Sequence, residues 1–396
     1  MDTMRFSRRT EWNTEESELA RAFRMRREAG LAIADLTASN PTRCGFNYDS
    51  SLLGALADPR ALDYDPQPRG LLAAREAVCD YYTGHGVAVD PGQIVLTTST
   101  SEAYSFLFRL LCDSGSEIVV LQPGYPLFDF LAGLDDVHLK AAPLLYDHGW
   151  QIDPEGIRRA VTPRTRAIVV VHPNNPTGHF TKRWEAEELA NICREHDLSL
   201  IVDEVFLDYG FGERVASFAA GLDEVPVFVV SGLSKIAGLP QMKAAWIVAA
   251  GPDRGAALDR LEVIADTFLS MNAPVQWALP AWLKGAPDLQ AQIRQRVAAN
   301  LSALDHGLAR LLAVERLALD GGWYAVLRIP ALDPDERTVL ALLEQGVWFH
   351  PGYFFGMPES GWLVISLLAP ELEFSHGVTL LINYFRKHQG SNIRSG

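Results

Sequence analysis

The chain has 396 residues, of which 48% are hydrophobic and 21% charged, a composition typical of soluble globular proteins rather than disordered chains. Its length predicts two or three domains. The formal net charge of −14 excludes a global field that would attract nucleic acid or an anionic membrane, although it is compatible with a local basic pocket for a small anion.

The cysteines and the N-terminal residues are both typical of a cytoplasmic protein. Cys44, Cys79, Cys112 and Cys193 are widely spaced and form no CxxC pair, so we expect reduced thiols rather than a metal site or a disulfide framework. Residues 1–13 are polar and basic, unlike a signal peptide, and no window approaches eighteen uncharged apolar residues. We therefore expect a cytoplasmic protein with no membrane-spanning helix.

From about residue 70 the predicted elements alternate between helices and strands. We expect helices at residues 14–30, 70–84, 101–111 and 182–196, and strands at 93–96, 117–121, 166–171, 198–202, 227–230 and 244–248. Most of these strands are short, β-branched and apolar at every position, which is typical of parallel strands buried on both faces. The order predicts an α/β layered domain with a mostly parallel sheet.

After about residue 285 the pattern changes. A long helix at 288–312 precedes a strand at 323–329, a helix from about 335, and strands near 347 and at 363–366. This order predicts a smaller α+β domain. We expect an N-terminal segment (residues 1–47) that packs on the small domain, a large domain (48–284) and a small C-terminal domain (285–396).

Polar residues follow several predicted strands at their carboxyl ends, where ligands bind in open α/β sheets. Ser99, Thr100 and Ser101 lie in a run of hydroxyl residues that opens a helix, a setting that suits a phosphate and is also typical of an ordinary N-cap. Asn175 lies in the turn His-Pro-Asn-Asn-Pro-Thr-Gly at 172–178, a pattern that turn chemistry alone also explains.

Two further strands end at charged residues. Asp203 follows the strand at 198–202, where a carboxylate is costly unless it is paired. Lys235 follows the strand at 227–230, and taken alone it would more often be a surface lysine. Pyridoxal 5′-phosphate needs a lysine for an imine, a carboxylate on its pyridine nitrogen, a donor to its ring hydroxyl, a phosphate cup and an aromatic cover. All five are present, so the sequence predicts a site for this cofactor and none for a metal.

The chain resembles the fold-type I, class I/II aminotransferases over nearly its whole length. Residues 64–75 resemble the family's tyrosine-glycine-arginine segment. The other matching segments are Pro-Gly-Tyr-Pro at 123–126, Asn-Asn-Pro-Thr-Gly at 174–178, Ser-Gly-Leu-Ser-Lys at 231–235 and His-Pro-Gly-Tyr-Phe-Phe-Gly at 350–356. The resemblance implies a large cofactor domain, a small domain, and a homodimer with shared active sites.

The resemblance also implies a role for each matched residue. Ser99, Thr100 and Ser101 are expected to contact the phosphate, Tyr125 the ring face and Asn175 the ring hydroxyl. Asp203 is expected to bind the pyridine nitrogen, Lys235 to form the imine and Ser234 to make a further cofactor contact. Tyr64 is expected to contact the phosphate of the partner subunit's cofactor.

Three positions depart from the family pattern. Phe206 occupies the position of a tyrosine that, in the family, shares the ring hydroxyl with the asparagine. Lys243 occupies the position of a phosphate-binding arginine, so it is either a point-charge contact to the phosphate or a solvated lysine. Val364 stands where many members carry the arginine that binds the substrate carboxylate. Asn40 and Arg43 are candidate substitutes, and a plain surface arginine is the alternative for Arg43.

These residues predict a ping-pong transamination between an amino acid and a 2-oxo acid, with Lys235 as the imine lysine and proton carrier. The alternative is another reaction of the same cofactor on this scaffold, such as a C–S or β-elimination lyase, synthase, decarboxylase or oxidase. A DNA-binding regulator is disfavoured, because the resemblance begins near residue 30 and the net charge is negative. The amino donor, the acceptor and the pathway stay open.

Overall fold

The computed structural model describes residues 5–212, 215–222 and 224–392. The chain divides into two compact units, one formed by residues 46–292 with 320–322 and the other by residues up to 45, 293–319 and those from 323 onward. One boundary falls inside the long helix α9 (Ala273–Leu308). The three-part division expected from the sequence, with boundaries after residues 47 and 284, stays a prediction.

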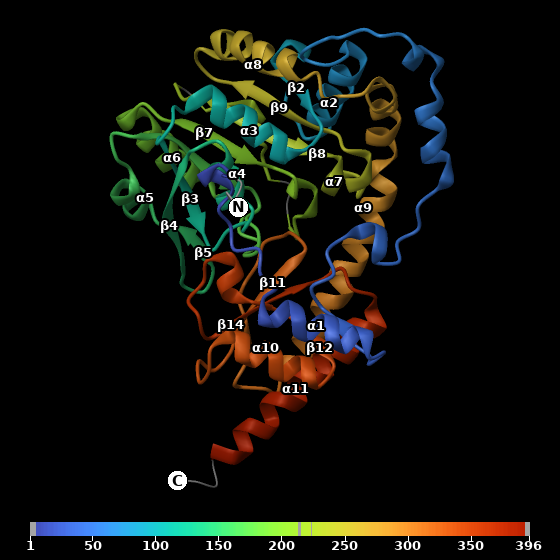
Figure 1. Cartoon of the computed structure of the whole chain (residues 1–396), viewed down its shortest axis with the longest axis vertical. Helices are drawn as coiled ribbons and strands as arrows, with labels where there is room; N and C mark the ends of the chain where they lie inside the picture. Colours follow the sequence, from blue (N-terminus) through green and yellow to red (C-terminus); the bar gives the residue numbers. More distant parts are fainter. Residues whose placement is uncertain (1–4, 213–214, 223, 393–396) are drawn as a thin grey trace. The chain divides into compact units, whose positions relative to one another are not determined.

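The unit of residues 46–292 is built on an eight-stranded sheet with the strand order β2-β9-β8-β7-β6-β3-β4-β5 (Figure 1). The strands are β2 (Ile94–Thr97), β3 (Glu117–Gln122), β4 (His138–Tyr146), β5 (Trp150–Ile152), β6 (Thr165–Val171), β7 (Ser199–Asp203), β8 (Val227–Gly232) and β9 (Ala245–Ala250). The run β4-β3-β6-β7-β8 is parallel throughout. Strand β9 is antiparallel to both of its neighbours, and β5 is antiparallel to β4. The predicted α/β class with a mostly parallel sheet is confirmed.

Helices cover this sheet and complete its core. They are α2 (Leu72–Gly84), α3 (Thr100–Leu111), α4 (Phe128–Leu134), α5 (Pro154–Ala160), α6 (Arg183–His196), α7 (Leu233–Ile236), α8 (Arg254–Phe268) and the first part of α9. Apolar side chains of α3, α4 and α8 form one buried cluster with side chains from β2, β3, β6, β7, β8 and β9. Because the strands are apolar on both faces, burial holds the sheet rigid and fixes the positions of the residues that follow each strand.

The other unit contains two small sheets. The strands β10 (Glu315–Arg316), β11 (Tyr324–Arg328), β14 (Trp362–Ser366) and β13 (His350–Pro351) form an antiparallel sheet in that order. Near the N-terminus, β1 (Ala34–Asp35) pairs in parallel with β12 (Val347–Trp348). The helices of this unit are α1 (Glu18–Glu28), α10 (Asp335–Glu344), α11 (Glu371–Asn392) and the last part of α9.

Short 3-10 helices connect these elements. They are η1 (Arg8–Thr10), η2 (Pro41–Arg43), η3 (Ser50–Ala57), η4 (Pro59–Leu62), η5 (Pro91–Gln93), η6 (Leu207–Tyr209), η7 (Phe218–Ala220), η8 (Pro240–Met242) and η9 (Gly352–Phe355). Within the described residues, no helix combines the length and the apolar character that crossing a bilayer requires.

Candidate active site

The candidate site lies at the edge of the large sheet where β7 and β8 end. Asp203 is the last residue of β7, and Lys235 lies in α7, which directly follows β8. Because β7 and β8 are parallel neighbours, both side chains start from the same edge of the sheet. Asp203 is buried and Lys235 is partly buried.

The two side chains shift each other's protonation. Burial raises the pKa of the Asp203 carboxyl to about 6, although hydrogen bonds from Val205 and Tyr104 oppose the rise. The positive charge of Lys235 opposes it as well. Burial lowers the pKa of the Lys235 amine to about 8, against the attraction of the Asp203 carboxylate. An amine with a lowered pKa is partly neutral near neutral pH, so it can act as a nucleophile and as a base.

Close contacts fix the segment that carries Lys235. The Tyr209 hydroxyl donates a hydrogen bond to the Lys235 carbonyl oxygen over 2.7 Å. Gly232 lies so close to β9 that a Cβ there would be 2.8 Å from the Cβ of Ala245, so only glycine fits without a shift. The Lys235 Nζ lies 5.6 Å from the centroid of the Phe206 ring. The amine therefore faces the aromatic residue that stands at the family's tyrosine position.

The run of hydroxyl residues after β2 forms the start of α3. Ser99 is the N-cap, and its Oγ accepts a hydrogen bond from the backbone N–H of Glu102 over 3.1 Å. The Glu102 carboxylate in turn accepts hydrogen bonds from the N–H of Thr98 over 2.7 Å and from the Ser270 hydroxyl over 2.9 Å. Ser99 thus has the ordinary capping role. The amides of Thr100 and Ser101 lie in the first turn, where helix N–H groups have no intrahelical acceptor and suit an anion.

Asn175 lies in a turn that follows β6. The turn is closed by hydrogen bonds from the N–H of Gly178 to the Asn174 carbonyl and from the N–H of Asn174 to the His179 carbonyl, both over 2.8 Å. The Asn175 side-chain oxygen is buried and has no hydrogen-bond partner in the described part of the chain. Since a buried amide without a partner is costly, this carboxamide is suited to a bound polar ligand.

Tyr125 follows β3 and is 39% exposed. Its ring contacts Phe128 edge-on, with 5.7 Å between the ring centroids. Burial raises the pKa of the Tyr125 hydroxyl, and the Asp203 charge adds to the rise. Tyr125 is therefore partly exposed, as a ring that covers a flat ligand requires.

These groups fit the cofactor that the sequence predicts. Asp203 is an ionisable acceptor for a heterocyclic nitrogen, Lys235 is an amine with a lowered pKa, and Asn175 offers an unused carboxamide oxygen. The start of α3 offers amides for a phosphate. Within the described residues no cluster of three or more histidine, cysteine, aspartate or glutamate side chains is suited to a metal ion.

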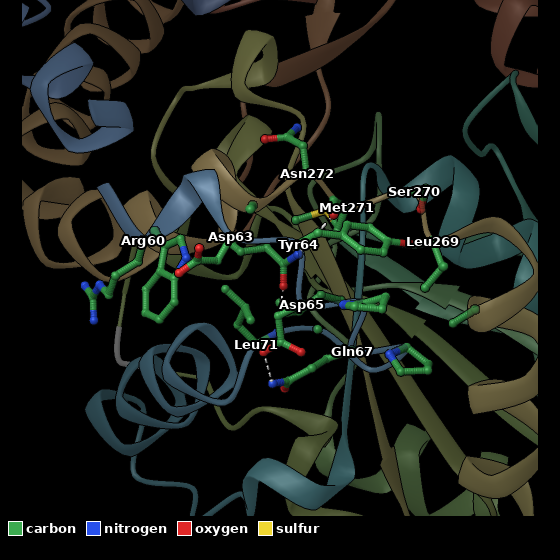
Figure 2. A pocket seen from close by; sticks show the side chains of 18 residues that line it. Arg60, Asp63, Tyr64, Asp65, Gln67, Leu71, Leu269, Ser270, Met271 and Asn272 are labelled. Atoms are coloured by element: carbon green, nitrogen blue, oxygen red, sulfur yellow. Dashed lines mark hydrogen bonds between the residues drawn. The ribbon is translucent and has the colours of Figure 1, made fainter. Parts of the chain in front are cut away.

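Tyr64 lines a pocket of about 430 Å³ within the same unit. Figure 2 shows Tyr64 and the segment from Leu269 to Asn272 on the walls of this pocket. Tyr64 is 83% exposed, so its ring packs little against the rest of the chain. Lys243 is also exposed and has a left-handed backbone, with φ at 53°.

The expected substrate contacts belong to the other unit. Asn40 caps η2, and its Oδ1 accepts hydrogen bonds from the Thr42 backbone N–H over 3.1 Å and from the Thr42 hydroxyl over 2.8 Å. Arg43 is the last residue of η2 and is exposed. Val364 is fully buried in β14, where it pairs with Val326 of β11. Val364 is therefore a buried core residue of this sheet, and its side chain carries no group that could bind a carboxylate.

Sequence reasoning did not identify two buried residues that hold the site. The Tyr104 hydroxyl donates a hydrogen bond to Asp203, and its one sequence signal is helical spacing, four residues after Thr100 on the same helix face. His179 lies between the carboxylates of Glu185 and Asp320 at the base of the Asn175 turn. The partner Asp320 is distant in the sequence, so no local pattern predicts this contact.

The chain is similar to one protein family and to several named enzymes. The family described as aminotransferase class I and II matches residues 54–372. The glutamate-pyruvate aminotransferase AlaA of Escherichia coli K12 is 32% identical over 267 residues, which are 65% of this chain and 65% of that protein. The match therefore spans less than two thirds of that relative. The aspartate/prephenate aminotransferase of Thermus thermophilus is 30% identical over 85% of this chain and 87% of its own length.

Solved structures share the fold over almost the whole chain. An alanine aminotransferase from Pyrococcus furiosus has a TM-score of 0.87 at 24% identity, covering 97% of this chain and 100% of its own. An aspartate aminotransferase from Thermus thermophilus, solved with maleate, has a TM-score of 0.83 at 25% identity, covering 96% of this chain and 100% of its own.

Proposed function

Since the chain belongs to the class I and II aminotransferase family, whose description matches residues 54–372, we propose that it moves an amino group between an amino acid and a 2-oxo acid with pyridoxal 5′-phosphate. The observation that carries the proposal is the placement of Asp203 and Lys235 after neighbouring parallel strands, each affecting the other's protonation. The names of the relatives favour amino-group transfer over the alternative of a lyase, synthase, decarboxylase or oxidase.

Four side chains hold the reactive part of the cofactor in this proposal. When bound, the cofactor supplies a protonated heterocycle that takes up electron density from the substrate's Cα. Asp203 binds the ring nitrogen and Lys235 holds the group covalently through Nζ. Asn175 binds the ring hydroxyl, which its unused buried carboxamide supports, and Tyr125 covers one ring face.

The phosphate binds at the start of α3. Ser99, Thr100 and Ser101 contribute hydroxyl and first-turn amide groups, and Ser234 and Lys243 complete the contacts. A helix N-terminus carries a partial positive charge that attracts an anion, so the dipole of α3 contributes as well. Lys243 adds a point charge, which binds a phosphate less specifically than the fork of an arginine.

Lys235 is also the proton carrier. The free Lys235 amine would accept the proton from the substrate's Cα and would later donate it, while the bound cofactor would hold the electron pair that this proton leaves behind. The lowered pKa of Lys235, about 8 because of burial, keeps a useful fraction of the amine neutral at physiological pH. The apolar Phe206 ring lies 5.6 Å from Nζ and contributes to the burial that lowers this pKa. For the substrate carboxylate, Asn40 and Arg43 stay the proposed contacts, and the KM of an Arg43→Ala variant tests them.

The assembly proposed from the family is a homodimer in which Tyr64 contributes to the partner's site. Exposed apolar side chains beside the Tyr64 pocket support it, because Leu62 is 89% exposed and Leu269 is 41% exposed. An exposed apolar surface of this kind is typical of an interaction site. A cytoplasmic location is proposed as well, on the ground that all four cysteines are free thiols.

A half-reaction on the purified holoenzyme tests the proposed function. Each amino acid of a panel is added without an acceptor, and the absorbance of the bound cofactor and the release of ammonia are followed. Transamination changes the absorbance to that of the pyridoxamine form and yields a 2-oxo acid without ammonia. Release of ammonia with a keto acid would instead identify an eliminating enzyme and contradict the proposal.

A further inference from the structure

Tyr104 is a buried tyrosine whose hydroxyl reaches the central acid of the site. It lies on α3, is 2% exposed, and donates a hydrogen bond from its hydroxyl to Asp203 Oδ2 over 3.0 Å. The other carboxylate oxygen, Oδ1, accepts the backbone N–H of Val205 over 3.0 Å. An ionised carboxylate has about four acceptor positions, so these two bonds leave acceptor capacity on both oxygens for a bound group.

Aromatic packing fixes the Tyr104 ring in this position. The Phe128 ring contacts it edge-on at a centroid distance of 5.0 Å, and Phe108 lies at 6.0 Å on the same helix. Both phenylalanines are buried. Because their rings offer no hydrogen-bond acceptor comparable to a carboxylate, the Tyr104 hydroxyl donates to Asp203. The hydroxyl is therefore directed at Asp203 by the core of the unit.

We propose that Tyr104 is a positioning residue which, through its hydroxyl, holds Asp203 ionised and oriented toward the heterocyclic nitrogen of the cofactor. This inference rests on the proposed function for the identity of the cofactor. It concerns a residue that the sequence motifs of the site do not include. A hydrogen bond to the charged form of an acid stabilises that form, and a bond to a charged group is worth more than one between neutral groups.

Several other titratable groups face Asp203. Lys235 favours its ionised form, and the neighbouring carboxyl of Glu204 disfavours it. Tyr82 and Tyr125 also interact with the Asp203 charge. Burial raises the pKa of the Asp203 carboxyl to about 6, so the removal of one donor moves an acid that already titrates close to neutral pH. The loss of the Tyr104 hydroxyl therefore has a measurable effect in the physiological range.

The test compares Tyr104→Phe with a matched control, Tyr82→Phe. Tyr82 is fully buried, and its hydroxyl accepts a hydrogen bond from Trp246 rather than contacting Asp203. In the cofactor-free protein, the Asp203 titration is followed by the carboxyl signal of isotope-labelled aspartate, assigned with Asp203→Asn. We expect Tyr104→Phe to raise the titration midpoint by about one to two pH units, the shift expected for one lost hydrogen bond to a charged group. Tyr82→Phe should leave it unchanged, because burial raises the pKa of the Tyr82 hydroxyl well above its ordinary value, so the group stays neutral in this range and places no charge on Asp203.

Cofactor affinity gives a second readout. In Tyr104→Phe the loss of affinity for pyridoxal 5′-phosphate on acidification should begin at a correspondingly higher pH. In an Asp203→Asn background the same substitution should change the Kd by less than about twofold, because the two residues act as one unit. An Asp203 titration that is unchanged in Tyr104→Phe, or an equal effect in both backgrounds, would overturn the inference. A wild-type protein that binds no cofactor while the titration shifts as expected would overturn the proposed function instead.

Discussion

The Nε2 of His179 lies 2.8 Å from the Oε2 of Glu185, and both side chains are buried. The other ring nitrogen, Nδ1, lies 3.7 Å from Asp320 Oδ2. The Glu185 carboxylate also accepts the backbone N–H of Lys182 at the start of α6 over 2.6 Å. An imidazole between two carboxylates is stabilised as the cation. His179 therefore links the Asn175 turn to the start of α6 and to Asp320.

This arrangement predicts a pH-dependent contribution to stability. Burial by itself would lower the pKa of His179, but the carboxylate of Asp320 and the hydrogen-bonded carboxylate of Glu185 raise it above its ordinary value. A group whose folded pKa is raised stabilises the fold fully below the unfolded value, about 6.5, and this contribution is lost as the pH rises through the folded pKa. His179→Gln should therefore lower the midpoint of thermal unfolding more at pH 6 than at pH 8.5.

The size of the effect is set by the buried carboxylates. Removing one partner of a buried ion pair costs about 3–5 kcal/mol, so the loss at pH 6 should be several degrees in a chain of this size. His196→Gln is the control, because it removes an exposed histidine at the end of α6. Equal losses for His179→Gln at both pH values would contradict the cationic assignment.

Much of the large sheet follows from local composition. The β-branched runs predicted strands at 166–171, 198–202 and 227–230, and the structure has β6 at Thr165–Val171, β7 at Ser199–Asp203 and β8 at Val227–Gly232. Burial on both faces makes these strands apolar throughout, so their sequence carries the signal. The reversed direction of β9 had no such signal, because hydrophobic periodicity does not encode strand direction.

Elements whose residues contradict local rules were predicted less well. Helix α9 was expected to begin near residue 288, yet it begins at Ala273 and contains Pro280 and Pro287. Proline disfavours a helix interior, so the sequence indicated a later start. β4 was not expected, because its mixed polar and apolar residues are only partly buried, beside the edge strand β5. In the site, the motifs indicated Asp203 and Lys235, but the contact of Tyr104 with Asp203 joins residues 99 positions apart.

A tyrosine at position 206 should change the titration of the bound cofactor. The Phe206 ring lies 5.6 Å from the Lys235 Nζ, so a hydroxyl on this ring would add a donor close to the reactive centre. A hydroxyl that donates to the ring oxygen of the bound cofactor stabilises the ionised form of that oxygen. Phe206→Tyr should therefore lower the spectrophotometric pKa of the bound cofactor by about one unit. Phe211→Tyr, which alters a 43% exposed ring, is the control. A titration curve identical to that of the wild type would exclude a role for position 206.

Lys243 should contribute to phosphate binding through its charge. Lys243→Ala is expected to weaken cofactor binding about tenfold, whereas Lys243→Arg should retain or increase affinity, because the guanidinium binds phosphate through two donors. The Kd is measured by fluorescence titration at low and high salt, with Lys284→Ala, another exposed lysine, as the control. Equal affinities for wild type and Lys243→Ala would identify Lys243 as a solvated side chain.

The exposed apolar side chains beside the Tyr64 pocket should lie in the dimer interface. Leu62→Glu is expected to shift the sedimentation profile from dimer toward monomer, because a buried unpaired charge opposes association. Leu372→Glu is a matched control, since Leu372 is 90% exposed and Leu62 is 89% exposed. A wild-type chain that sediments as a monomer, or two variants with the same profile, would contradict the proposed assembly.

Identification of the lysine that carries the cofactor tests the central claim most directly. The purified protein is incubated with pyridoxal 5′-phosphate, reduced with borohydride, digested, and analysed by peptide mass spectrometry. We predict that the cofactor's mass is attached to Lys235, and that Lys235→Ala carries none and loses turnover by at least about a hundredfold. Attachment to another lysine such as Lys243, or a wild-type protein with no attached cofactor, would contradict the account.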